Sequence, residues 1–230
     1  MSILAYWNEI VSEYNDNLNC KEEIVQKTWE VLFKLCFGYS KAEIDSQRSV
    51  KMGVMTKRAD IVITNSAEDL FVVELKRHVL HEGQEQLFSY LNQLKIDIGI
   101  LVNESLWIYD FDYTKKDSYS AFKIEFTENN SDGAKFIELF TCENFDKEKI
   151  KNFIYEKNLS ENNSNEIKKE LTSSNFIQNL IKQYFSEKYP SEEVKAVLEE
   201  FEISLKKKSQ IISMCPVYPK VTKHIVVDPE

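Results

Sequence analysis

The 230-residue chain lacks several features that would place it in a class at once. It has no run of 18 apolar residues, so no membrane-spanning helix is expected. Its amino terminus has no basic segment and soon turns polar, unlike a signal peptide. The four cysteines are widely scattered without a CxxC pair, a pattern typical of reduced thiols. We therefore expect a cytoplasmic protein with no membrane partner.

Histidine and net positive charge are also scarce. His78 and His81 are three residues apart, but no cysteine or second pair completes a zinc site, and a polar loop is the simpler interpretation. The net charge of −9 argues against a broadly basic surface that binds nucleic acid. The segment 47–77 differs from this average, because its six basic residues outnumber its four acids.

Three charged residues stand inside two apolar runs. Asp60 lies within the run 59–63, and Glu74 and Lys76 lie within the run 72–76. Isolated charges in an apolar interior cost several kcal/mol or shift their pKa. The polar run 65–69 predicts a five-residue hairpin loop, which sets Asp60 directly opposite Glu74. Because side chains alternate along a strand, Lys76 lies on the same face.

Two carboxylates that face each other across a hairpin repel, and this repulsion indicates a divalent cation between them. Two oxygen ligands completed by water suit Mg²⁺ (or Mn²⁺). Lys76 would then stabilise charge on a phosphate or help to activate the attacking water. The alternative is that these are edge-strand charges that face solvent. Apolar residues on both faces of the hairpin speak against it: Ile61, Ile63, Phe71, Val73 and Leu75 on one face, and Val62 and Val72 on the other.

The patterns along the chain predict an α/β fold. A helix at 21–37, with Asn19 as its N-cap and Gly38 after its end, precedes a polar strand at 44–51 beside the hairpin or at an edge. The hairpin strands at 58–64 and 70–76, a helix at 82–95 and a strand at 96–102 follow, the last three as a right-handed βαβ unit. Further strands are expected at 106–111, 122–126 and 135–140.

Beyond Glu143 the pattern turns helical. Helices are expected at 145–155, 167–185 and 190–205, with a linker at 160–165. We therefore expect a first domain at 1–143 and a helical C-terminal region with an extended tail at 144–230. The apolar stripe of the middle helix predicts five buried positions, at Ile167, Leu171, Phe176, Leu180 and Tyr184.

The order helix, strand, hairpin, helix, strand, with Asp60 and Glu74-Leu75-Lys76 on the hairpin, resembles the PD-(D/E)XK nuclease superfamily. The nearest resemblance is to the amino-terminal nuclease domain of type I restriction-enzyme R subunits, over about residues 20–112. The QxxxY element of that family matches Gln86 and Tyr90, which share one helix face. The resemblance implies a restriction-endonuclease-like mixed sheet core (α-β-β-β-α-β) flanked by helices.

The same resemblance implies roles for named residues. Asp60, Glu74, Lys76, Gln86 and Tyr90 would form the catalytic set, with Asp60 and Glu74 as metal ligands. The superfamily often adds an acid from the first helix, for which Glu22, Glu23 and Glu30 are the candidates. Glu23 is favoured because Glu22 is in a capping position, although a solvated helix face explains each of them. The residues expected to contact nucleic acid are Lys57, Arg58 and Arg77.

Two departures from the family pattern are visible. Ala59 stands where many members have proline, which is a frequent variation. The R subunits continue into an ATPase motor, but this chain has no Walker lysine loop, so we expect a stand-alone nuclease-like protein without a nucleotide cofactor.

Two functions follow from the sequence. The first is a metal-dependent endonuclease-like hydrolase that acts on DNA, in a restriction, defence or mobile-element setting. The second is a non-catalytic binding or scaffolding subunit with the nuclease fold, which the acidic net charge and the long helical tail favour. In either case we expect the C-terminal helices to add to the sheet domain or to build a homodimer contact.

Overall fold

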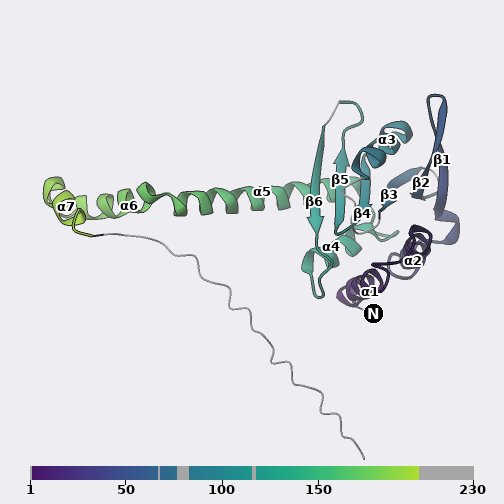
Figure 1. The fold of residues 1–230 in the computed structure, drawn as a ribbon, viewed down its shortest axis with the longest axis horizontal. Helices are drawn as coiled ribbons and strands as arrows, with labels where there is room; N and C mark the ends of the chain where they lie inside the picture. Colours follow the sequence, from purple (N-terminus) through teal and green to yellow (C-terminus); the bar gives the residue numbers. More distant parts are fainter. Residues whose placement is uncertain (1, 67, 77–82, 116–117, 202–230) are drawn as a thin grey trace, which may run out of the picture. The chain divides into compact units, whose positions relative to one another are not determined.

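The computed structural model describes residues 2–66, 68–76, 83–115 and 118–201 (Figure 1). The chain divides into two compact units, Met1–Ser164 and Asn165–Glu230. The first unit therefore ends later than the limit at 143 expected for the first domain. Among the described residues, no helix is both long and apolar enough to cross a membrane.

The first unit is built on a six-stranded mixed sheet with the strands in sequence order (Figure 1). Only β3 and β4 pair in parallel, and helix α3 (Gln84–Leu94) connects them as the predicted βαβ unit. The expected mixed α/β fold is confirmed. The strand bounds are β1 Ile44–Met52, β2 Met55–Thr64, β3 Asp69–Leu75, β4 Ile98–Val102, β5 Leu106–Phe111 and β6 Tyr119–Ile124.

Helices cover both faces of this sheet. Helix α3 packs on one face, where Leu87, Tyr90 and Leu91 join Val62 and Val72 in a core. Strand β3 is consequently buried on both sides, which explains its nearly continuous apolar sequence. The other face is covered by α1 (Ile3–Asp16), α2 (Glu22–Leu35), α4 (Ser131–Phe140) and the first turns of α5 (Lys147–Thr172).

The hairpin of β2 and β3 has the register that the sequence predicts from Ile63 toward Asp60. The five-residue loop expected at 65–69 is wrong, because Asp69 pairs with Thr64 and the register shifts between Ile63 and Thr64. Ile61 pairs with Val73, and Val62 with Val72, so Asp60 and Glu74 are the next facing positions. Ile61 and Val73 join the core under α1, α2 and α4, whereas Val62 and Val72 join the α3 core. Strand β1 pairs with β2 at the edge of the sheet, as expected.

The strand predicted at 135–140 is wrong, because residues 131–140 form helix α4. The side chain of Asn130 accepts hydrogen bonds from the backbone N–H groups of Asp132 and Gly133, at 2.9 and 3.4 Å, and so caps the helix. A Cβ atom at Gly133 would lie 2.1 Å from the Trp7 ring, so α4 packs closely against α1. The short apolar run fitted a strand equally well.

Two details of the amino-terminal helices also differ from expectation. Helix α1 has no counterpart among the predicted elements. Helix α2 begins after Lys21, without a side-chain cap, so the prediction of Asn19 as N-cap is wrong. Gly38 takes a left-handed φ of 79° shortly after this helix ends, as a glycine in that position does.

The expected linker at 160–165 is part of helix α5, which continues to Thr172. Helices α6 (Ser174–Ser186) and α7 (Ser191–Leu198) follow. The burial predicted for the apolar stripe is wrong in the described structure, where all five side chains are exposed: Ile167, Leu171, Phe176, Leu180 and Tyr184. The homodimer through these helices stays a prediction.

Candidate active site

The candidate site begins with the facing carboxylates of the β2–β3 hairpin. Glu74 is completely buried and Asp60 is half-buried. Asp60 Oδ2 accepts a hydrogen bond of 2.9 Å from the backbone N–H of Leu75, so the side chain of one strand is fixed by the backbone of the other. Burial raises the pKa of Asp60. The hydrogen bond from the Leu75 N–H and the positive charge of Lys76 lower this pKa, but their effect is smaller than that of burial.

The carboxylate of Glu74 is the most unusual group of the site. Its Oε1 lies 2.5 Å from Nζ of Lys76, and its Oε2 has no hydrogen-bond partner among the described residues. Burial, followed by the charge of Asp60, raises the pKa of Glu74 to about 8, although Lys76 works in the opposite direction. A buried carboxylate oxygen without a partner is costly and calls for a ligand.

The stability of the metal-free protein should therefore depend on Glu74. Between the ordinary pKa of 4.5 and about 8, the folded state holds a proton on Glu74 that the unfolded state releases. The contribution of Glu74 to the free energy of unfolding is therefore largest at low pH and is lost as the pH rises toward about 8. Melting temperatures measured in EDTA from about pH 5 to 8 should fall for the wild type and fall much less for Glu74→Gln. The exposed Glu128→Gln is the control, and an equal fall in all three proteins would contradict this assignment.

Lys76 follows directly after β3, and its backbone N–H donates to the carbonyl of Val102 at 2.8 Å. Its side chain is 15% exposed. Burial lowers the pKa of Lys76, but the hydrogen bond to Glu74 and the charges of Glu74 and Asp60 outweigh it, so the net pKa is raised. A lysine that stays protonated acts as a fixed positive charge and not as a base.

Gln86 and Tyr90 lie one helical turn apart on α3. Gln86 Nε2 donates to the Tyr90 hydroxyl at 2.9 Å, and this hydroxyl donates to the backbone carbonyl of Arg58 at 2.6 Å. The pair thus ties α3 to strand β2 two residues before Asp60. The charges of Glu74, Asp60 and Lys76 all act on the pKa of Tyr90, which burial raises. Both residues support the strand that carries Asp60.

Gln47 is a site residue that the sequence analysis did not identify. It lies in β1 with a left-handed φ of 55°, which is unusual for a residue other than glycine. Its Nε2 donates to Oδ1 of Asp60 at 3.3 Å and to Oε1 of Gln26 at 2.7 Å. Strained backbone of this kind often occurs at functional sites. The only signal in the sequence was a polar residue in a strand next to the hairpin.

The acids of α2 differ in their relation to the site. The charge of Glu22 acts on the pKa of Asp60, Glu74 and Lys76. Glu30 accepts a hydrogen bond of 3.0 Å from Gln26 and so lies at the far end of the Gln26–Gln47–Asp60 chain. Electrostatics therefore favour Glu22 over the expected Glu23.

Two observations show that the carboxylates fit a divalent cation. Oε2 of Glu74 has no hydrogen-bond partner among the described residues, and repulsion from Asp60 contributes to the raised pKa of Glu74. A bound cation would lower that pKa. The described residues contain no group of three Asp, Glu, His or Cys side chains suited to a metal. Water would thus have to supply most of the ligands, which is usual for Mg²⁺.

The residues expected to bind nucleic acid are only partly described. Lys57 and Arg58 are exposed on β2, on the amino-terminal side of Asp60. Neither forms an ion pair with any residue that the structure describes. Arg77 lies outside the described residues, as do His78 and His81.

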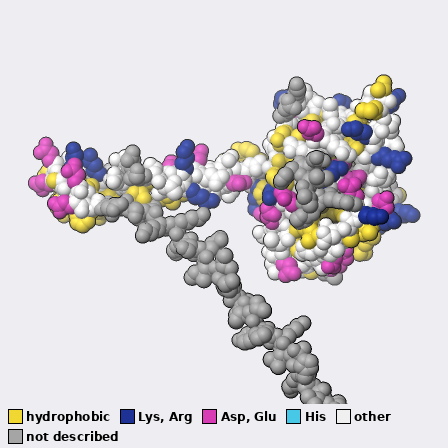
Figure 2. Space-filling model, in the orientation of Figure 1, with side chains coloured by type: hydrophobic (Ala, Val, Ile, Leu, Met, Phe, Trp, Pro, Cys, Tyr) yellow, Lys and Arg dark blue, Asp and Glu magenta, His cyan; other side chains and the backbone are white. Residues whose placement is uncertain are grey.

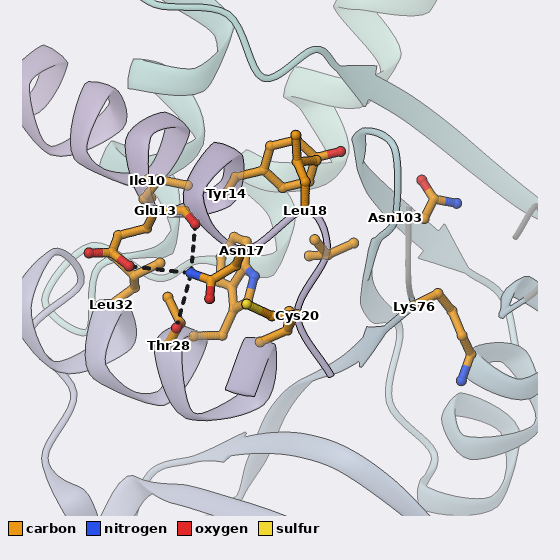
Figure 3. Close-up of a pocket in the computed structure, with 13 residues that line it drawn as sticks. Ile10, Glu13, Tyr14, Asn17, Leu18, Cys20, Thr28, Leu32, Lys76 and Asn103 are labelled. Atoms are coloured by element: carbon orange, nitrogen blue, oxygen red, sulfur yellow. Dashed lines mark hydrogen bonds between the residues drawn. The ribbon is translucent and has the colours of Figure 1, made fainter. Parts of the chain in front are cut away.

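A pocket lies beside the candidate site, between α1, α2 and the ends of β3 and β4 (Figure 3). At its centre Asn17 donates to the backbone carbonyl of Glu13 at 2.7 Å and to Thr28 Oγ1 at 3.4 Å. Lys76 lines this pocket, but its amine points away from Asn17 in Figure 3. The amine of Lys76 therefore contacts Glu74 and not the polar groups of this pocket.

A mixed sheet with an acid on one hairpin strand and Glu-x-Lys on the next is similar to the arrangement expected for a PD-(D/E)XK-like nuclease domain. Residues 21–124 match the family described as "Type I restriction enzyme R protein N terminus (HSDR_N)". This match confirms the resemblance drawn from the sequence, over the segment that runs from α2 to β6. The comparison with curated proteins finds no match.

Proposed function

We propose that the chain is a metal-dependent nuclease that hydrolyses phosphodiester bonds of DNA. The observation that carries this proposal is the buried Glu74, which faces Asp60, contacts Lys76 and keeps Oε2 without a hydrogen-bond partner among the described residues. An ordinary ion pair on the surface would leave its carboxylate exposed, whereas Glu74 is completely buried. The match of residues 21–124 to a restriction-enzyme domain supports the same reaction class.

Asp60 and Glu74 would hold Mg²⁺ or Mn²⁺, and Glu22 is the candidate for a further acid in place of Glu23. When bound, the ion supplies Lewis-acid polarisation of a phosphoryl oxygen. Lys76, held protonated by its two acidic neighbours, donates to a non-bridging oxygen of the scissile phosphate and stabilises the charge that develops there. Gln86 and Tyr90 hold strand β2, and with it Asp60, in position.

The first test is incubation of the purified protein with linear, circular and single-stranded DNA in Mg²⁺ or Mn²⁺. We expect cleavage with metal, none in EDTA, and none by Asp60→Ala. Folded protein that leaves every DNA intact under all of these conditions would contradict the proposal.

The net charge of −9 favours a second function, a nuclease-fold binding or scaffolding subunit that does not cut DNA. In that case wild type and Asp60→Ala would bind DNA alike and both would leave it uncut. DNA is the partner in either case.

A further inference from the structure

The hairpin of β1 and β2 carries an unusual concentration of positive charge. Its part from Arg48 to Arg58, here called the hairpin arm, contains four basic residues and no acid, in a chain with a net charge of −9. Arg48 is neutralised by ion pairs with Asp69 and Asp45. Lys51, Lys57 and Arg58 are exposed and form no ion pair with any described residue. Three positive charges are thus available to an anionic partner.

The end of the hairpin arm is apolar and exposed. Met52 pairs with Met55 across a two-residue turn in which Gly53 has a φ of 61°. Val54 is fully exposed and Met55 is 62% exposed. Figure 2 shows apolar side chains at the far end of the hairpin and Lys and Arg side chains over the part nearer the sheet. Exposed apolar side chains that lie beside basic side chains are typical of a surface that binds a partner.

The base of the hairpin arm is fixed to the domain. Val50 and Ala59 are buried in the core formed with α3, and the Tyr90 hydroxyl donates to the carbonyl of Arg58. The arm is therefore held in place while its charged side chains and its tip stay exposed. Strand β2 leads without interruption from Met55 to Asp60.

We propose that the hairpin arm binds double-stranded DNA next to the candidate site, and this inference rests on the proposed function. Lys51, Lys57 and Arg58 contact backbone phosphates, and Val54 and Met55 enter the minor groove and part a base step, as apolar wedges do. Five residues of strand span roughly 17 Å at about 3.3 Å per residue. With a rise of about 3.4 Å per base pair, the wedge acts about five base pairs from the phosphate at Asp60.

The phosphate contacts are tested by the salt dependence of binding to a fluorescent 30-base-pair duplex in EDTA, where cutting is blocked. Each lost contact should reduce the slope of log affinity against log salt by about 0.9, so Lys51→Gln/Lys57→Gln/Arg58→Gln should reduce it by roughly 2.7. The control Lys168→Gln/Lys169→Gln/Lys182→Gln removes the same charge from exposed positions of α5 and α6 and should leave the slope unchanged. Equal slopes for wild type and the arm variant would overturn the phosphate contacts.

The wedge is tested with 2-aminopurine placed in turn at each position of one strand, since its fluorescence rises when it is unstacked. Wild type should give a rise at one step, and Val54→Ser/Met55→Ser should lose it. No rise at any position, or an equal rise with the serine variant, would overturn the insertion.

A parallel cleavage assay in Mg²⁺ separates this inference from the proposed function. If wild type cuts DNA but the arm variants bind like wild type, the arm inference fails and the nuclease stands. If the arm variants behave as expected but wild type does not cut, the arm inference stands and the nuclease fails. Wild type that binds no duplex at all overturns the arm inference, and cleavage of single-stranded DNA in Mg²⁺ still decides the nuclease.

Discussion

Lys76→Ala is expected to reduce the rate of DNA cleavage by about 10²–10³-fold, the usual effect of removing one group that stabilises transition-state charge. The amine lies 2.5 Å from Glu74 and is kept protonated by Glu74 and Asp60. The loss should appear in the single-turnover rate at saturating protein, with little change in DNA affinity, because the charge is needed most when the phosphate reacts.

The fold of this variant needs a separate measurement, because removing Lys76 leaves Glu74 buried without its cation. At neutral pH Glu74 already holds a proton in the metal-free protein, since its pKa is raised to about 8, so the variant loses a hydrogen-bond partner of a neutral acid and leaves no unpaired buried charge. The melting temperature should therefore fall modestly in EDTA and recover in Mg²⁺. Lys76→Met, which keeps most of the side-chain volume, should lose cleavage equally. Either variant cutting as fast as wild type while folded would refute the role assigned to Lys76.

A chain that ends at Glu143 is expected not to fold, whereas one that ends at Ser164 should keep the domain. Ile150, Phe153 and Ile154 of α5 are buried in the core under the sheet. Burial of each contributes about 1.5–3 kcal/mol, so their loss costs roughly 5–9 kcal/mol. That is comparable to the whole stability of a typical domain, about 5–15 kcal/mol. Lys151, which lies 3.3 Å from Asp97, adds an ion pair to the same attachment.

Urea unfolding followed by tryptophan fluorescence and circular dichroism distinguishes the two truncations. Residues 1–164 should unfold cooperatively and near the urea concentration of the full chain, and residues 1–143 should show no transition. Ile154→Ala in the full chain should cost about 2–5 kcal/mol, as a core truncation does, and exposed Leu159→Ala is its control. If residues 1–143 unfold cooperatively like 1–164, the domain ends before α5.

The hairpin and its facing carboxylates could be predicted because strand alternation and loop length are local properties. Asp60, Glu74 and the apolar residues around them followed from these two rules. The short run ending at Phe140 was ambiguous by periodicity, and its helix is decided by the Asn130 cap and the packing of Gly133 on Trp7. The contact of Gly133 with Trp7 is distant in sequence and is not visible in a short window, whereas the Asn130 cap is a local signal.

The rest of the site depends on how elements pack together. Glu22 and Glu23 are adjacent in sequence, and which of them affects the site depends on the rotation of α2, which Trp29 and Phe33 fix in the core. Gln47 contacts Asp60 from a left-handed conformation that its sequence does not indicate. Gln86 and Tyr90 were expected from the family motif, but the hydrogen bond from Gln86 to the Tyr90 hydroxyl and the one from that hydroxyl to the Arg58 carbonyl required the structure.

The most direct test of the central claim is calorimetric titration with Mn²⁺ at neutral pH, in the absence of DNA. If Asp60 and Glu74 hold the ion, wild type should bind it, and Glu74→Gln and Asp60→Asn should each lose most of the binding. Glu23→Gln, which removes a nearby exposed charge of α2, should bind like wild type. Equal binding by all four proteins, or none by any of them, would contradict the assignment of Asp60 and Glu74 as a divalent-cation site.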